Sequence, residues 1–91
     1  MPKPKIPRCV RFNPNVCYFK PQGIPLSILE EVILYLDEME ALKLYDMDGF
    51  DQTKAAKKMK ISQPTFARIL DGAYKKIVQA LVGGKAIKII K

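Results

Sequence analysis

The segment 51–70, DQTKAAKKMKISQPTFARIL, constrains the fold more than any other part of the chain. It predicts two short helices joined by a tight turn at residues 60–61. Asp51 precedes the first helix and Ser62 precedes the second, and both residue types cap helix N-termini through a side-chain oxygen. Pro64 falls in the first turn of the second helix, where a missing N–H costs nothing.

The apolar residues of this segment lie where two crossing helices would bury them. Three line the first helix, one fills the turn and three line the second: Ala55, Ala56, Met59, Ile61, Phe66, Ile69 and Leu70. This pattern is typical of a DNA-binding helix-turn-helix, whose second helix enters the major groove. An ordinary pair of antiparallel helices would show the same spacing. Lys60 departs from the motif, because glycine is frequent there and a positive φ would cost a lysine about 1 kcal/mol.

Charge is distributed unevenly along the 91 residues, which are enough for one domain. The net charge of +7 combines +5 over residues 1–20, −7 over residues 21–51 and +9 over residues 52–91. Basic charge concentrated on the predicted two-helix unit and on the N-terminal arm indicates phosphate binding. The alternative is a solvated lysine-rich surface, and we interpret Lys75 and Lys76 in that way.

The sequence lacks residues and segments that several functional classes require. The chain has no histidine, no apolar run of membrane-spanning length and no signal-peptide core, so we expect a cytoplasmic protein. No nucleophile–base pair, phosphate loop or metal cluster is visible, and we predict neither an enzyme nor a cofactor or metal site. Cys9 and Cys17 are expected to be free, packed thiols; a redox-sensitive pair, or a metal site shared by a dimer, is the alternative.

The predicted fold is mainly α: a helix-turn-helix domain of three to four helices with short extended N-terminal and C-terminal segments. Residues 1–25 form a basic extended arm with a hairpin turn near residues 13–15, and residues 26–91 form the helix-turn-helix domain, the two together making one folded unit. For residues 26–36 the sequence is compatible with two interpretations, a short helix from Ser27 or a strand over 32–35.

Capping patterns predict the remaining helices. Asp37, with Glu40 three residues later, resembles a capping box that starts a helix ending at Gly49. Its apolar surface would come from Met39, Leu42, Leu44 and Met47. The last helix is expected from Gln63 to about Val82, followed by two glycines, and residues 85–91 by an edge strand against Cys9–Phe12 or against a second chain.

Residues 36–82 resemble region four of bacterial sigma factors, through the run Leu-Asp-Glu-Met-Glu-Ala-Leu at 36–42, a glycine and the two-helix unit. The whole chain resembles a family of small, uncharacterised, predicted DNA-binding proteins of archaea and bacteria. That match adds the basic proline-rich start, Tyr-Phe-Lys-Pro at 18–21, Gly-Ile-Pro-Leu at 23–26, and residues 63–70. The resemblance implies a sigma-region-four-like helix-turn-helix, from which Lys60 and Pro64 depart.

We therefore expect sequence-specific binding of double-stranded DNA and a role in transcriptional regulation. The predicted base-reading residues lie early in the last helix: Ser62, Gln63, Thr65, Ala67 and Arg68. Glutamine pairs bidentately with adenine, and arginine with guanine or a phosphate. The predicted phosphate contacts are basic residues of the two-helix unit and the arm: Lys54, Lys57, Lys58, Lys60, Lys3, Lys5, Arg8 and Arg11.

A homodimer is expected, since one reading helix supplies little affinity. The main alternative is a protein-interaction module that docks on RNA polymerase or another regulator through the acidic helix at 38–48. A thiol- or metal-responsive regulator using Cys9 and Cys17 is another. RNA binding through stacked aromatic side chains is a further alternative, although no RNA-module signature is present.

Overall fold

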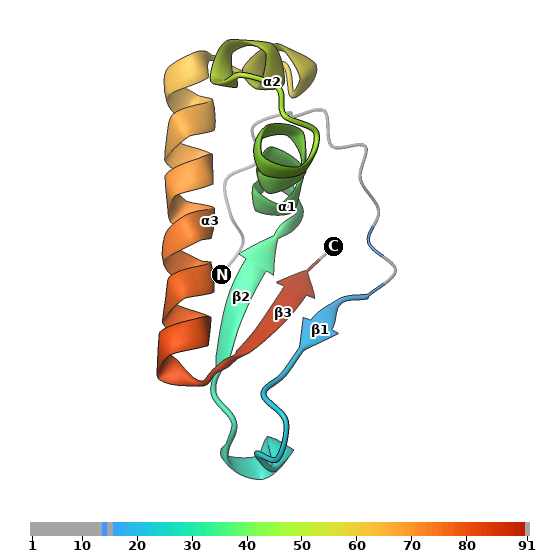
Figure 1. Cartoon of the computed structure of the whole chain (residues 1–91), viewed down its shortest axis with the longest axis vertical. Coiled ribbons are helices and arrows are strands. Elements are labelled where there is room, and N and C mark those ends of the chain that lie inside the picture. The colour runs from blue at the N-terminus through green and yellow to red at the C-terminus, as the bar shows by residue number, and fades with distance from the viewer. Residues whose placement is uncertain (1–13, 15, 91) are drawn as a thin grey trace.

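The computed structural model describes residue 14 and residues 16–90. In chain order the elements are β1 (Tyr18–Phe19), a 3₁₀ turn η1 (Leu26–Ile28), β2 (Glu31–Tyr35), α1 (Leu36–Leu42), a π-helical segment η2 (Lys43–Met47), α2 (Gln52–Lys58), α3 (Gln63–Gly83) and β3 (Ala86–Ile90). Figure 1 shows α3 along one side of the molecule, with α2 at the end where α3 begins, α1 beside its middle and the strands toward its other end.

The last strand, β3, is the middle strand of a three-stranded sheet with the order β1-β3-β2. Lys88 lies opposite Ile33 in the parallel pairing with β2 and opposite Tyr18 in the antiparallel pairing with β1. The prediction of an edge strand at residues 85–91 is therefore wrong, because strand order depends on pairing between distant segments. The predicted partner Cys9–Phe12 lies outside the described residues, as does most of the predicted hairpin.

Residues 26–36, where the sequence left helix and strand open, contain both a 3₁₀ turn and a strand. Leu26–Ile28 make the turn, and β2 follows at Glu31. Val32 and Leu34 are buried while their neighbours along β2 are more exposed. This alternation is the period of two that a half-buried strand requires.

The start of α1 differs from the predicted cap. Tyr35 occupies the N-cap position, and Asp37 already lies in the first turn. The backbone N–H of Tyr35 donates to Oε1 of Glu38 over 2.9 Å, so Glu38 takes the part predicted for Glu40. The predicted cap is wrong because β2 runs directly into α1 without a loop.

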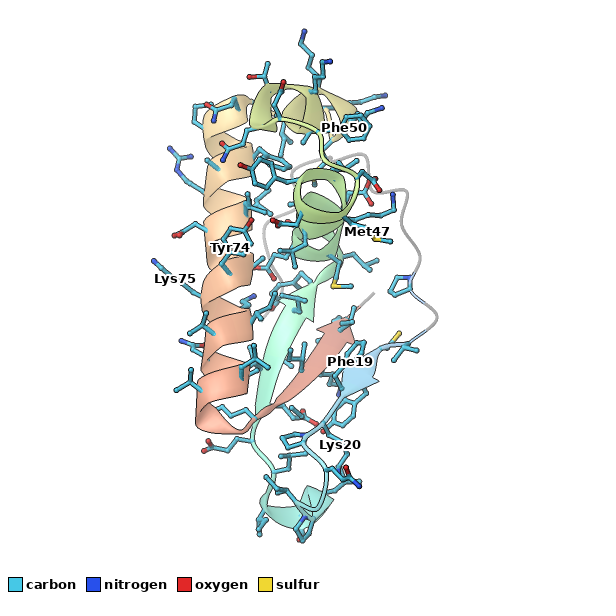
Figure 2. The ribbon with its side chains drawn as sticks, viewed as in Figure 1. Phe19, Lys20, Met47, Phe50, Tyr74 and Lys75 are labelled. Carbon is cyan, nitrogen blue, oxygen red and sulfur yellow. The ribbon has the colours of Figure 1, made fainter. Side chains whose placement is uncertain are left out.

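The segment η2 continues α1 to Met47, and Gly49 ends the helical run with a φ of 80°, as predicted. The Phe50 N–H donates to the Leu44 carbonyl over 3.0 Å and turns the chain toward α2. Met47, which we predicted to supply apolar surface to the core, is 81% exposed (Figure 2). A π-helix has more residues per turn than an α-helix, so the side chains of η2, including Met47, depart from the α-helical spacing.

Two apolar clusters hold the elements together. The first joins α1, η2, α2 and the first half of α3 through Ala41, Leu44, Ala55, Ala56, Met59, Phe66 and Leu70. The second lies between the sheet and the middle of α3 and is built on Leu34, Ala73 and Ile89. Phe66 and Met59 are the largest completely buried side chains. The first cluster therefore fixes α2 against the start of α3.

The mainly helical fold predicted from the sequence is confirmed, and its extended segments gather into one small sheet. The last helix ends at Gly83, one residue beyond the predicted end, and Gly84 follows in a left-handed conformation. Within the part of the chain that the structure describes, no helix has the length and apolar character needed to cross a membrane.

Candidate nucleic-acid interface

The helix α2 is held at both ends by the residues that the sequence indicated. Oδ1 of Asp51 accepts a hydrogen bond from the Lys54 N–H over 2.8 Å. At the other end the Lys60 and Ile61 N–H groups donate to the carbonyls of residues 57 and 56, both over 3.0 Å. This is a Schellman ending, and it places Lys60 at a φ of 58°. The lysine therefore occupies the strained position that the sequence suggested.

The turn between α2 and α3 is short and closed by apolar packing. Ile61 is half-buried against the cluster of Met59 and Phe66, both of which have no exposed surface. Ala55 and Ala56 are also buried, and their small side chains let α3 pass close to α2. The two helices consequently form one rigid corner.

The start of α3 carries a polar cap at the surface. Oγ of Ser62 accepts from the Thr65 N–H over 3.3 Å and donates to the Thr65 hydroxyl oxygen over 2.9 Å. Both hydroxyls are thus engaged in capping the N-terminus of α3, which limits the freedom of these two side chains. Pro64 fits the first turn, as predicted.

The five predicted base-reading residues do not form one patch. Ser62, Gln63 and Arg68 are exposed, whereas Thr65 and Ala67 are half-buried. At 100° per residue, Gln63 and Arg68 lie about 140° apart around α3, while Gln63 and Ala67 lie about 40° apart. Gln63 and Ala67 therefore lie on nearly the same side of α3, and Arg68 lies on a different side of the helix.

The predicted phosphate-binding lysines of α2 and the turn are all exposed: Lys54, Lys57, Lys58 and Lys60. The ammonium of Lys58 lies 4.6 Å from the centre of the Phe50 ring, which restrains this side chain by a cation–π contact. Three of them belong to α2, which lies at the end of the molecule where α3 begins (Figure 1). The arm residues Lys3, Lys5, Arg8 and Arg11 lie outside the described residues.

Lys76 is not the solvated side chain that we predicted. Its ammonium lies 2.7 Å from Oε1 of Glu38, whose side chain is 8% exposed. Lys75 does match the prediction, with a side chain that is 74% exposed, and Figure 2 shows it pointing away from the body of the molecule. The difference arises because α1 covers the side of α3 that carries Lys76, whereas Lys75 lies on a side that α1 leaves uncovered.

One residue that sequence reasoning missed lies at the start of α2. Nε2 of Gln63 donates a hydrogen bond of 2.6 Å to Oε1 of Gln52. The two glutamines are 11 residues apart, and each directly follows the N-cap residue of its helix. The sequence signal for this contact was a glutamine directly after the N-cap residue of each helix. The two glutamines meet only because the two helices cross.

The acidic helix proposed for protein docking presents less charge than its sequence suggests. Asp37, Glu38 and Glu40 are all buried, between 3% and 8% exposed. Asp48 is paired with Lys43 over 2.7 Å. Four of the carboxylates in this region thus already serve the fold.

Cys17 is half-buried, packs against the cluster of Leu34 and Ile89, and places its sulfur 3.9 Å from the Pro14 carbonyl oxygen. Cys9 lies outside the described residues. Among residue 14 and residues 16–90, no three His, Cys, Asp or Glu side chains are grouped as metal ligands would be.

Comparison with known proteins assigns the chain to a family. Residues 1–91 match the family described as "Protein of unknown function DUF134". The chain belongs to this family. A UPF0251 protein of Caldanaerobacter subterraneus subsp. tengcongensis is 56% identical over 89 residues, which cover 98% of this chain and 75% of that protein. A UPF0251 protein of Thermoanaerobacter pseudethanolicus is 51% identical over 89 residues, with the same two coverages.

Other members extend further beyond the matched region. A UPF0251 protein of Moorella thermoacetica is 51% identical over 89 residues, covering 98% of this chain but 60% of that protein. No solved structure matches this member of the family significantly. A functional proposal must therefore come from the chemistry of its surface.

Proposed function

We propose that this protein binds double-stranded DNA sequence-specifically and regulates transcription, with α2, the turn and α3 acting as a helix-turn-helix. The observation that carries the proposal is the corner between α2 and α3. A closed apolar core fixes the two helices, the polar start of α3 is exposed, and the four lysines of α2 and the turn are exposed as well. Such a corner is complementary to a DNA duplex in shape, because one helix can enter the major groove, and in charge, because the lysines are positive and the phosphates negative.

Lysines and the start of α3 would contribute differently to binding. Lys54, Lys57, Lys58 and Lys60 would contact phosphates on both sides of the groove and position the protein. Gln63 would read a base edge, with Ala67 close enough to pack on a thymine methyl group. Ser62 and Thr65, which already bond to each other, would contact the backbone rather than select a base.

A dimer would supply the affinity that one short reading surface lacks. Apolar side chains are exposed at the end of α3 away from α2, where Val78, Leu81 and Val82 are 56%, 75% and 84% exposed. A second copy joined at this end would leave both corners free for DNA. Sedimentation of the protein alone and with duplex would show the stoichiometry.

The alternative is docking on RNA polymerase or another regulator through the acidic helix at 38–48, and the exposed apolar end of α3 offers it a second surface. This alternative gives the corner between α2 and α3 no role in binding, because a docking module does not need the exposed lysines of α2 and the turn. Binding of polymerase in the absence of DNA, together with failure to bind duplex, would favour this alternative.

The test of the main proposal is the salt dependence of duplex binding. We expect binding at low salt, with an association constant that falls steeply on a log–log plot, because each neutralised phosphate contributes a slope of about −0.9. A random pool of duplexes should yield a preferred sequence. Absence of binding at low salt, or a slope near zero, would contradict the proposal.

A further inference from the structure

The hydrogen bond between Gln52 and Gln63 links the first residue of α2 to the first residue of α3 at the exposed corner. Its length of 2.6 Å makes it a close contact, and both side chains lie on the surface that would face DNA. Gln52 is half-buried, whereas Gln63 is exposed. The half-buried side chain of Gln52 therefore restrains the exposed side chain of Gln63.

The direction of this bond decides what remains for a ligand. A glutamine amide has two N–H donors and one carbonyl acceptor. Gln63 uses one N–H on Gln52, so its other N–H and its carbonyl oxygen remain. These two are an adjacent donor and acceptor when the N–H given to Gln52 is the one opposite the carbonyl oxygen. Adenine presents the complementary pair in the major groove, an N7 acceptor beside an N6 donor.

We propose that Gln52 is a positioning residue that orients the Gln63 amide for bidentate recognition of adenine in an A·T base pair. The inference rests on the proposed DNA-binding function and adds the base that is read and the residue that sets the reading. Gln63 must place the N–H on the carbonyl side of its amide toward N7, and this leaves only the opposite N–H for Gln52.

Orientation matters because the reverse amide geometry would not distinguish adenine. An exposed glutamine without a partner rotates freely about its side-chain bonds and presents its donor and acceptor in either order. Gln52 presents its amide oxygen to Gln63, and that oxygen accepts only from an N–H, so the bond in this arrangement selects one of the two orders. Gln52 itself is held by α2, whose Ala55 and Ala56 are buried in the core.

A merely structural role for the bond predicts a different outcome. If it served only to fasten α2 to α3, its loss would lower stability and weaken binding to every duplex by the same factor. A positioning role predicts loss of discrimination at one base pair, with the other positions unaffected. The readout is therefore a discrimination ratio at each position of the selected site.

The experiment uses the full chain and compares Gln52→Met, which removes the acceptor, with Gln52→Glu, which keeps an acceptor and adds charge. Gln63→Ala and the double variant Gln52→Met with Gln63→Ala complete the cycle. Gln79→Met is the matched control, because it makes the same exchange at an exposed glutamine far along α3. Gln52→Ala serves as a second variant without the amide, and thermal unfolding verifies that each variant folds.

We expect wild-type protein to prefer one A·T pair by about tenfold over the other base pairs, and Gln63→Ala to abolish that preference. Gln52→Met should reduce the preference to about threefold or less at this position alone. Gln52→Glu should bind every duplex more weakly and keep the preference. The double variant should match Gln63→Ala, and Gln79→Met should match wild type.

The proposal is overturned if Gln52→Met keeps the full preference, if it weakens all positions equally, or if Gln63→Ala affects a G·C pair or no position. In each of these cases the wild-type protein still binds duplex with a salt-dependent preference, and the proposed function stands. If wild-type protein binds no duplex, the proposed function itself fails, and the first titration shows this before any variant is compared.

Discussion

The ammonium of Lys76 on α3 lies 2.7 Å from Oε1 of Glu38 on α1, and the same oxygen accepts the N–H that begins α1. The Lys76 side chain is 27% exposed and that of Glu38 is 8% exposed. The ammonium also lies 4.6 Å from the centre of the Tyr35 ring. One buried carboxylate thus caps a helix and ties it to another.

Replacing Lys76 with Met should destabilise the protein by up to about 3 kcal/mol, because it leaves the buried Glu38 carboxylate without its counter-charge. This is the lower end of the range for buried pairs, since Lys76 keeps some contact with water. Lys75→Met is the control: Lys75 pairs with Asp71 at the surface, and its loss should cost less than about 0.5 kcal/mol. Urea unfolding of both variants measures the difference, and equal losses would contradict the assignment.

Lys60→Gly should stabilise the protein by about 1 kcal/mol, because glycine adopts the φ of 58° without the clash that a side chain meets there. Lys57→Gly removes the same charge from a right-handed position in α2 and should destabilise by about 0.5–1 kcal/mol. Thermal unfolding at one ionic strength compares them. Shifts of the same sign would show that charge, rather than backbone conformation, governs the effect.

Tyr74 should make stability sensitive to pH between 10 and 12. Burial of its hydroxyl and the 2.6 Å hydrogen bond to Asp46 raise its pKa from 10.0 to about 12. Because the folded pKa is the higher one, the stabilisation is complete below pH 10 and is lost as pH rises toward 12. The stability advantage of wild type over Tyr74→Phe should therefore shrink across this interval in urea titrations. A constant difference would contradict this linkage.

Lys57→Ala and Lys58→Ala should each weaken binding to all duplexes alike and lower the salt slope by about one. Lys88→Ala provides the control, since Lys88 is an exposed lysine on β3, which is separated from α2 by α1 and β2 (Figure 1). Lys58→Ala should also cost about 0.5–1 kcal/mol of stability through its contact with Phe50. A change in the preferred sequence would show that these lysines read bases.

Arg68→Ala should affect a different part of the site from Gln63→Ala, because the two side chains lie about 140° apart around α3. If Arg68 reads a guanine, its loss should cost about 1–3 kcal/mol at one G·C pair. If it holds a phosphate, affinity should fall uniformly and the salt slope should drop by about one. Competition titrations against single-substituted duplexes separate these results, and loss of preference at the Gln63 position would contradict both.

Local capping chemistry made the corner between α2 and α3 predictable. Asp51 and Ser62 cap the helices as expected, and Lys60 takes the left-handed turn position. Each of these features depends on residues within a few positions of one another. The spacing of Met59 and Phe66 also placed both in the core correctly, because helical periodicity fixes which face is buried.

The sheet and the polar contacts between elements could not be predicted in the same way. Lys88 pairs with Ile33 and Tyr18, which are distant in the chain and carry no mark of their partner. Lys76 and Lys75 look alike in the sequence, and only the position of α1 separates a buried ion pair from an exposed one. The Gln52–Gln63 bond likewise follows from how two helices cross.

The central place of β3 in the sheet has a consequence for the order of folding. It is the last of the three strands to be synthesised, yet β1 and β2 pair with it and not with each other. Pairing partners as distant as Glu31 and Ala86 close late, since long loops form more slowly than helical turns. On the ribosome the helices would therefore form and pack first, with two strands left unpaired until β3 enters between them.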